Sequence, residues 1–297
     1  SHSVHPFLDN TILPYIILKI YSRNLIYSIL ELIRLKTNTD NLLHSNPELY
    51  AVFENDKSFE MARFIHAILQ KYETGKKVLD VGSGLGREVA FLREKGYDAV
   101  GIDASEDMVA WSQKHYPNAN FYIGQQAMFD LNQTFDALVC VGSTFLYNYT
   151  NEDAGSTLTN FRKHLKDGGI LYLDMRNAAF FLTKEGQRWL TDELLEEAIF
   201  DGKPAIVKTR FYIDLAKQIL KRDYNWKIGT REAIIEHLEH RLFFPQEIAG
   251  LLSANGFEVV ELFDKPEPHI SSFTDIRPFQ FGYELSGRRL QVIAKAI

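Results

Sequence analysis

Three closely spaced glycines, Gly82, Gly84 and Gly86, separate a short apolar run from a helix-like segment in residues 78–92, VLDVGSGLGREVAFL. Glycines in a strand-to-helix turn let a ligand approach the backbone, and a phosphate, a dinucleotide or an adenosyl sulfonium would each use such a turn. No Lys-Ser or Lys-Thr pair follows the glycines, so the phosphate-loop interpretation fails. Arg87 occupies the place of the third glycine in a dinucleotide fingerprint, which argues against a pyrophosphate cradle. The remaining interpretation is that the glycine turn binds a nucleoside ligand without phosphate.

A carboxylate ends the next apolar run, DAVGID (98–103). Asp103 comes nineteen residues after Gly84, where a carboxylate can accept hydrogen bonds from both hydroxyls of a ribose. The same carboxylate could cap the helix that follows, because acidic side chains are favoured at helix N-termini. The two roles are compatible.

Two histidines with different surroundings lie in residues 234–244, IIEHLEHRLFF. If this segment is a strand, Glu236 and His240 share its more apolar face, and His237 lies among charges on the other. His240 can then act as a general base, oriented by Glu236, or serve as a hydrogen-bonded structural residue. Tyr147 is a further catalytic candidate, because it follows an apolar run at the end where parallel strands gather catalytic residues.

The elements that must position these residues alternate along the chain. Short apolar runs, each followed by a segment of helical period, predict an α/β fold, a doubly wound parallel sheet with helices on both faces. The predicted strands are 77–81, 98–103, 120–124, 135–141 and 169–175, and the predicted helices are 58–72, 86–95, 105–115 and 153–165.

The alternation of predicted strands and helices ends after residue 178. A helical stretch over 184–200 precedes two alternating segments, 205–228 and 231–244, which predict an inserted antiparallel ribbon. Basic residues of the ribbon alternate with apolar ones, which is typical of a solvated strand face. Pro245 begins a helix over 245–254, and two closing strands follow at 256–263 and 288–297.

Composition excludes several classes of function. The 297 residues carry a net charge of −6, which argues against a general nucleic-acid binder, and the single cysteine, Cys140, excludes an internal disulfide. We expect no metal site and a cytoplasmic location.

Residues 11–35 are apolar but interrupted by charges, so they predict neither a membrane span nor a cleaved signal. They favour an amphipathic helix packed on the body over a surface for a partner, a second subunit or a membrane.

Four segments resemble the successive motifs of class I S-adenosylmethionine-dependent methyltransferases: VLDVGSGLGRE, GYDAVGIDASEDMVAWS, FDALVCVGSTF and FRKHLKDGGILYLDMRN. The resemblance covers roughly residues 45–297, and CVGSTF followed by LDMRN is similar to glycine and sarcosine N-methyltransferases. Methyltransferases of natural-product pathways that act on amino sugars or polyketides are further similar families. The resemblance implies a Rossmann-like seven-stranded sheet with its last strand antiparallel, an N-terminal helical extension, an inserted antiparallel β lid, and S-adenosylmethionine as methyl donor.

The resemblance also implies which residues surround the donor. Asp80 would support the glycine turn, Asp103 would bind the ribose, two groups would flank the adenine, and the remaining residues would line the methyl channel or close over the donor. The predicted donor-binding residues are Tyr50, Lys57, Asp80, Gly82, Ser83, Gly84, Asp103, Ala104, Met108, Gln126, Ala127, Met128, Cys140 and Gly142.

We expect four segments: an N-terminal helical extension (1–57), the donor-binding α/β core (58–177), an inserted helix and β-ribbon lid over the acceptor site (178–244), and the C-terminal part of the core (245–297). The acceptor is predicted to be a small molecule, free or tethered to an acyl carrier protein. The N-terminal helix is a candidate contact between identical subunits.

Three functions fit these observations. The favoured one is methyl transfer to an oxygen of a small specialised metabolite, with His240 as the general base and Glu236 and Tyr147 beside it. The alternative is an N-methyltransferase of a small amine or amino acid, whose carboxylate Arg176 would hold, as the resemblance to glycine N-methyltransferase implies, with Ser143 as a further acceptor-binding residue. Ser143 and Ala178 replace the amide and the tyrosine of that family, so the pocket is not expected to be built for glycine itself. A remote third is a non-catalytic scaffold that binds the donor.

Overall fold

The structure of the protein is a computed structural model, which describes residues 42–53, 59–268, 273 and 280–297. Most of the predicted N-terminal extension, including Lys57 and the candidate contact between subunits, lies outside these residues. Within the extension, the described part ends in helix α2 (Pro47–Phe53). No helix in the described ranges is long and apolar enough to span a membrane.

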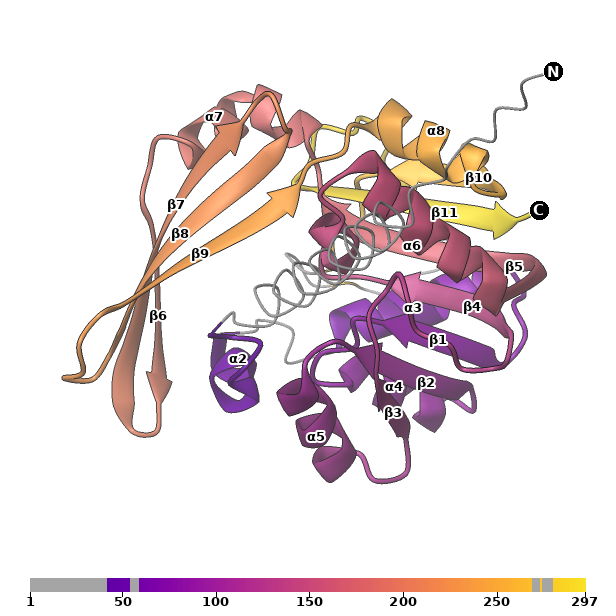
Figure 1. Ribbon diagram of the computed structural model, residues 1–297, viewed down its shortest axis with the longest axis horizontal. Helices are drawn as coiled ribbons and strands as arrows, with labels where there is room; N and C mark the ends of the chain where they lie inside the picture. The colour runs from indigo at the N-terminus through magenta and orange to yellow at the C-terminus, as the bar shows by residue number, and fades with distance from the viewer. Residues whose placement is uncertain (1–41, 54–58, 269–272, 274–279) are drawn as a thin grey trace, which may run out of the picture. The chain divides into compact units, whose positions relative to one another are not determined.

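A seven-stranded sheet forms the core (Figure 1). Its strand order is β10-β11-β5-β4-β1-β2-β3, and β11 runs antiparallel to both of its neighbours. The predicted Rossmann-like sheet with an antiparallel last strand is thereby confirmed. The strands are β1 (Lys77–Val81), β2 (Asp98–Asp103), β3 (Asn120–Ile123), β4 (Phe135–Cys140), β5 (Leu165–Arg176), β10 (Phe257–Phe263) and β11 (Arg289–Ala296).

Helices cover both faces of this sheet because its strands are apolar on both sides. Val78 of β1 packs in one buried cluster with side chains of α3 (Glu60–Lys71), α4 (Arg87–Glu94) and α5 (Glu106–His115). The next residue, Leu79, belongs to a second cluster with α6 (Asn151–His164) and α8 (Pro245–Ala254).

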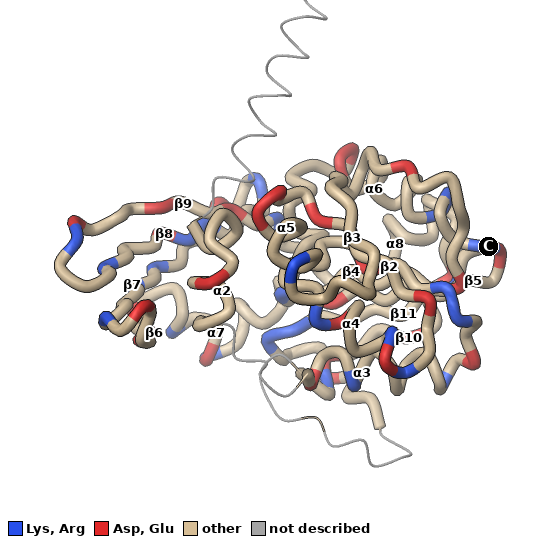
Figure 2. The backbone as a smooth tube through the Cα atoms, turned by 90° about the horizontal axis from the view of Figure 1, so that it is seen from below, with Lys and Arg blue, Asp and Glu red and all other residues tan. Residues whose placement is uncertain are grey.

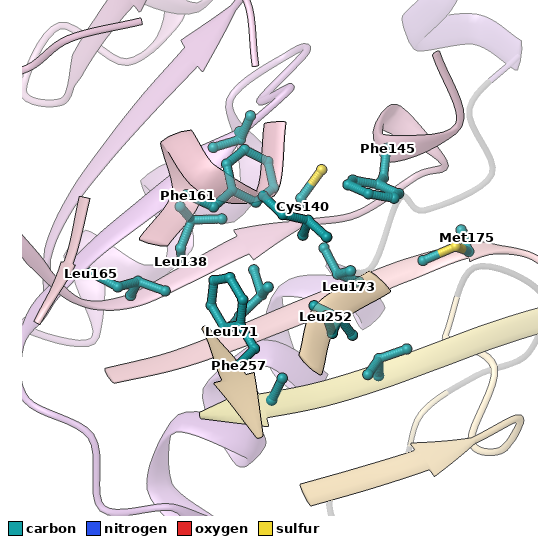
Figure 3. Close-up of a cluster of buried hydrophobic side chains, with 14 of the residues drawn as sticks. Leu138, Cys140, Phe145, Phe161, Leu165, Leu171, Leu173, Met175, Leu252 and Phe257 are labelled. Atoms are coloured by element: carbon teal, nitrogen blue, oxygen red, sulfur yellow. The ribbon is translucent and has the colours of Figure 1, made fainter. Parts of the chain in front are cut away.

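The second cluster takes in the predicted channel residue Cys140 (Figure 3). Its thiol is fully buried, and Leu138 of the same strand lies in the cluster with Phe161 of α6. Burial raises the pKa of the Cys140 thiol well above its usual range. The Cys140 side chain therefore packs in the core of the protein.

The inserted lid is a separate four-stranded antiparallel sheet in the order β6-β7-β8-β9 (Figure 1). Its strands are β6 (Leu194–Phe200), β7 (Lys203–Asp214), β8 (Ile219–Ile228) and β9 (Ile234–Arg241). Short helices η1 (Thr144–Tyr147) and η2 (Ala179–Leu182) precede it, and η1 packs against β9.

Two predictions about the lid were wrong. The expected helix over 184–200 is a short helix, α7 (Lys184–Trp189), followed by β6, because pairing of β6 along β7 outweighs the helix propensity of its residues. The expected single segment 205–228 is the β7–β8 hairpin. At its turn, Asp214 accepts a hydrogen bond from the Lys217 N–H, and Gln218 adopts a left-handed φ of 54°.

Charges of both signs are interspersed along the lid strands and the core (Figure 2). The interpretation of the basic lid residues as a solvated face holds for Lys208, Arg210 and Lys227, which are exposed. It is wrong for Arg222, which is 6% exposed and lies on the inner face of the lid.

Candidate active site

The glycine turn after β1 is held by both packing and conformation. Gly82 and Gly84 have left-handed φ values of 79° and 49°, which glycine adopts at little cost. The Gly82 N–H donates to the Ile102 carbonyl at 2.8 Å, which ties the turn to β2. A Cβ on Gly82 would lie 2.3 Å from Thr144 Oγ1, whereas a Cβ on Gly84 would meet nothing within 4 Å. Gly82 thus serves packing, and Gly84 faces open space that a ligand can occupy.

Asp103 lies at the end of β2 beside that open space. Its Oδ2 accepts a hydrogen bond from the Gly84 N–H at 2.8 Å, and its Oδ1 accepts one from the Ser105 N–H at 2.8 Å. The carboxylate therefore joins the glycine turn to the start of α5. Each oxygen keeps a further lone pair that a ribose hydroxyl can use.

Asp80 is a buried carboxyl group whose two oxygens accept no hydrogen bond within the described chain, and it is 1% exposed. Burial raises its pKa well above the usual range, and the negative charges of Glu88 and Asp103 raise it further. Leaving such a group unpaired is costly, so its presence points to a positively charged or hydrogen-bonding ligand. S-adenosylmethionine carries both a sulfonium and an ammonium group, and it fits this environment.

The other predicted donor-binding residues differ in exposure. Met108 is 2% exposed, whereas Ala104 and Met128 are exposed at the surface. Gln126 donates to the Thr144 carbonyl at 3.3 Å, and its own amide oxygen is buried without a partner in the described chain.

Several further candidates surround the glycine turn. Ser83 is 4% exposed, and Ala127 is half-buried. The Gly142 N–H donates to Asp174 Oδ2 at 3.3 Å. Tyr50, at the start of the chain's described part, lines a cavity between α2 and the lid.

His240 lies on the inner face of β9 and is 3% exposed. Arg222 Nη2, on the neighbouring strand β8, is 2.9 Å from His240 Nε2 and 3.1 Å from Nδ1. The ring of Tyr147 meets the imidazole edge-on, with centroids 4.8 Å apart. The structure therefore brings together His240 and Tyr147, as the sequence predicts, and adds Arg222 to them.

These contacts make His240 a weak base. Burial lowers its pKa well below the usual range, and the positive charges of Arg222 and Arg176 lower it further. The imidazole is consequently neutral at physiological pH. Burial also raises the pKa of the Tyr147 hydroxyl, which is therefore protonated.

Glu236 shares the inner face of β9 with His240, but its hydrogen bonds go elsewhere. Its carboxylate accepts from the Leu42 N–H and, at 2.9 Å, from the indole N–H of Trp226. Burial raises the pKa of Glu236. Arg222, rather than Glu236, makes the described contacts with the ring nitrogens of His240.

Arg176 is the last residue of β5, and its positive charge acts on His240. Its guanidinium stacks over the Phe211 ring at 5.8 Å, and burial lowers its pKa to about 9, assisted by the positive charge of Arg222. It remains charged at neutral pH. No acidic side chain in the described ranges forms an ion pair with it.

Ser143 positions this arginine. It has a left-handed φ of 77°, and its Oγ accepts hydrogen bonds from the Arg176 N–H at 3.2 Å and from Arg289 Nη1 at 3.0 Å. Arg289 is itself paired with Asp174, with Nε 3.0 Å from Oδ1. The Ser143 hydroxyl is buried, at 2% exposure of the residue, and its hydrogen bond with the Arg176 N–H holds the backbone that carries Arg176.

Sequence reasoning missed two members of the cluster, Arg222 and His44. The ring of His44 lies 6.1 Å from the ring of Tyr147, and the Ser105 hydroxyl donates to the His44 carbonyl at 2.7 Å. Burial lowers the pKa of His44, although Asp103 opposes this effect. Arg222 stands two residues before Tyr224 and four before Trp226. Because alternate residues of a strand share a face, this spacing could have predicted that Arg222 lies on the same face as the two aromatic residues.

Comparison with known proteins identifies the family. Residues 53–262 match the model of the methyltransferase domain family. An N,N-dimethyltransferase of dTDP-3-amino-3,4,6-trideoxy-alpha-D-glucopyranose from Streptomyces venezuelae is 27% identical over 119 residues, 40% of this chain and 50% of that protein. A glycine/sarcosine N-methyltransferase from Aphanothece halophytica is 31% identical over 113 residues, 36% of this chain and 43% of that protein. The chain thus spans half or less of the length of these relatives.

Solved structures share the fold over most of the chain. A sugar N-methyltransferase from Streptoalloteichus superimposes with a TM-score of 0.65 at 19% identity, covering 84% of this chain and 91% of that one. An S-adenosylmethionine-dependent methyltransferase from Clostridium acetobutylicum gives a TM-score of 0.64 at 14% identity, covering 82% and 93%. These structures show the shared fold, and the family match over more than half of the sequence shows that the chain belongs to the methyltransferase domain family, whose cofactor is S-adenosylmethionine.

Proposed function

We propose that this methyltransferase domain transfers a methyl group to the nitrogen of a small amine that also carries a carboxylate or another anionic group. A single observation carries the proposal. Arg222 is in hydrogen-bond contact with the buried His240, and the positive charges of Arg222 and Arg176 both lower the pKa of its imidazole. Positive charge therefore lies beside the neutral imidazole of His240, whose lowered pKa makes it a poor general base.

An oxygen acceptor needs a group that removes its proton. Such a base works best when its pKa is close to the operating pH. The pKa of His240 is lowered well below that range, because its protonated form would be buried beside a guanidinium. This weighs against the oxygen acceptor that the sequence favoured.

A nitrogen acceptor needs only to arrive uncharged. Positive charge close by disfavours the ammonium form, so Arg176 and Arg222 lower the pKa of an amine bound between them. The amine then presents its lone pair without a protein base. Arg176 can at the same time hold an anionic group of the acceptor by paired hydrogen bonds. A free amine and an amine tethered to an acyl carrier protein both meet these requirements.

The donor would lie along the glycine turn. Gly84 leaves room for it, Asp103 can accept hydrogen bonds from its ribose, and the carboxyl group of Asp80 can ionise when a cationic group of the donor lies beside it. When bound, S-adenosylmethionine supplies a methyl group already activated by its sulfonium. The lid excludes water, and Arg176 orients the acceptor for in-line attack.

The curated relatives agree with a nitrogen acceptor. The two compared above are named as an amino-sugar N,N-dimethyltransferase and a glycine/sarcosine N-methyltransferase. Ala178 and Ser143, however, stand where the resemblance to glycine N-methyltransferase expects a tyrosine and an amide, so we infer that glycine itself is not the acceptor.

The test is a screen of paired acceptors with isotopically labelled donor. Each pair shares one carbon skeleton and one carboxylate or phosphate, and differs only in an amine against a hydroxyl. We expect label in the amines and, by mass spectrometry, N-methyl products. Transfer to hydroxyls with amines left untouched would overturn the nitrogen proposal and restore the oxygen acceptor.

A further inference from the structure

A cavity of about 180 Å³ lies between α2 and the inner face of the lid, beyond the arginine–histidine cluster along β8. Four of the residues that line it are aromatic. Its complete lining is Leu43, Tyr50, Phe53, Glu196, Val207, Tyr224 and Trp226. An engineered apolar cavity of about 150 Å³ holds one benzene molecule, so this cavity has room for a group of similar size.

The aromatic walls meet one another at different angles. Phe53 meets Trp226 edge-on, with centroids 5.2 Å apart and an interplanar angle of 89°. The Tyr224 ring is only tilted against Trp226, with centroids 6.0 Å apart and an interplanar angle of 33°. The Trp226 ring is fixed because its N–H donates to Glu236 at 2.9 Å. Several aromatic rings around one cavity are the arrangement by which proteins recognise alkylammonium ions through cation–π attraction, and we call the residues that line this cavity the cage.

Glu196 gives the cage a negative charge. It lies opposite Val207 in the β6–β7 pairing, and both side chains line the cavity. The Glu196 side chain is exposed, and its charge also acts on the guanidinium of Arg176. Its neighbour Glu197 points to the other face of the strand, because successive side chains alternate.

We propose that this cavity binds an alkylammonium cation. The rings supply cation–π attraction, and Glu196 supplies the opposite charge. A caged ammonium offers no lone pair, so the group held here is distinct from the amine that reacts. The acceptor would then carry a second, non-reacting alkylammonium group, a statement about the acceptor that rests on the proposed N-methylation.

The experiment titrates the full-length protein with choline by calorimetry. Its neutral isostere, 3,3-dimethylbutan-1-ol, has the same shape without the charge. We expect choline to bind at least about fivefold more tightly than the isostere, the scale of a partly desolvated cation–π contact. Equal affinity for the two, or no binding of choline, overturns the proposal.

Variants locate the bound ion. Glu196→Gln should weaken choline at least about fivefold, since it removes the opposite charge while keeping the shape. Glu197→Gln is the matched control on the other face and should leave the affinity unchanged. Phe53→Leu keeps an apolar wall but removes a ring, and should weaken choline more than the isostere. Equal effects of Glu196→Gln and Glu197→Gln would contradict a site in the cage.

Failure of this proposal can be told apart from failure of the proposed function. Choline binding is measured without donor or turnover, whereas the acceptor screen measures turnover alone. Binding of choline without methylation of any amine leaves the cage standing and removes the N-methylation. Competition of choline with the acceptor, but not with the donor, is the result expected when both hold.

Discussion

Arg222 and His240, on adjacent strands of the lid, are in direct hydrogen-bond contact, with Arg222 Nη2 2.9 Å from His240 Nε2. They are diagonal neighbours, because Arg222 pairs with Leu238 and His240 with Leu220 in the β8–β9 register. A neutral imidazole can accept this hydrogen bond, and an imidazolium cannot. The contact therefore couples the packing of the lid to the protonation of His240.

Stability should fall on acidification below the usual histidine pKa of 6.5. The folded pKa of His240 is lower than the unfolded one, so in this range the unfolded chain takes up a proton that the folded protein refuses. The stability is thus fully present above 6.5 and is lost as pH falls toward the folded pKa. A slope of up to about 1.4 kcal/mol per pH unit is expected from one such group.

Urea unfolding at several pH values between neutrality and mild acid measures this slope. His240→Asn removes one buried histidine whose pKa is lowered and should reduce the slope, leaving the part that His44 contributes. His237→Asn is the matched control, since His237 is exposed on the opposite face of β9 and contacts Asp223. Equal slopes in wild type and His240→Asn would show that His240 is not held neutral by the fold.

The two glycines of the turn should respond differently to alanine. Gly82→Ala places a Cβ 2.3 Å from Thr144 Oγ1 and should lower the free energy of unfolding by at least about 2 kcal/mol. Gly84→Ala meets no atom, so it should cost only the left-handed backbone strain of about 1–2 kcal/mol, yet weaken the donor at least tenfold by occupying its space. Unfolding curves and donor titrations of both variants separate the two effects. Unchanged donor affinity in Gly84→Ala would place the donor elsewhere.

Loss of the Asp103 charge should weaken S-adenosylmethionine and S-adenosylhomocysteine alike. Hydrogen bonds to a charged group contribute roughly 1.5–3 kcal/mol, so Asp103→Asn should reduce affinity at least tenfold by calorimetry. Asp107→Asn, in the first turn of α5, is the control for a general change of charge there. The same affinity in both variants would remove Asp103 from the donor site, and tight binding of NAD would overturn the choice of cofactor.

The core of the fold could be predicted because its signals are local. Strand residues such as Val78 and Leu79 are apolar in unbroken runs, and the glycine turn has its own backbone requirement. The lid was harder to predict from the sequence, because the residues of β6, such as Leu194 and Glu196, follow a pattern that is also compatible with a helix. Only its pairing with β7, a contact between segments, decides for a strand.

The same difference between local signals and contacts between distant segments applies to the candidate site. Asp103 and Gly84 meet in the structure, as the order of their elements suggested. The partner of His240 could not be read from neighbouring residues, because Arg222 comes from another strand and only the register of the lid brings it there. The alternation of residues placed His240 on the more apolar face of its strand, but it could not reveal the contact with Arg222 that lowers the pKa of His240 further.

Arg176 should control acceptor binding rather than donor binding. Arg176→Gln removes a charged anchor and should raise KM for an amine that carries a carboxylate at least tenfold, while the donor affinity stays within about twofold. Arg210→Gln, on the exposed face of β7, is the matched control. Steady-state kinetics with an acceptor from the screen measures both. A KM unchanged in Arg176→Gln would exclude it as the anchor.

The pH dependence of turnover distinguishes nitrogen from oxygen. If the acceptor is an amine, protonation of that amine stops the reaction at low pH, and the acid limb of the pH–rate profile belongs to the substrate. His240→Ala should then keep this limb and lose only a modest factor in rate. If His240 were the base for a hydroxyl, the same change should cut turnover by about 10²–10⁴-fold and abolish the limb. Donor affinity, measured in parallel, should stay intact in either case, which separates a lost base from a collapsed site. Because the pKa of His240 is held low by Arg222 and by burial, we expect the limb to persist and to move with the pKa of the amine when acceptors of different basicity are compared.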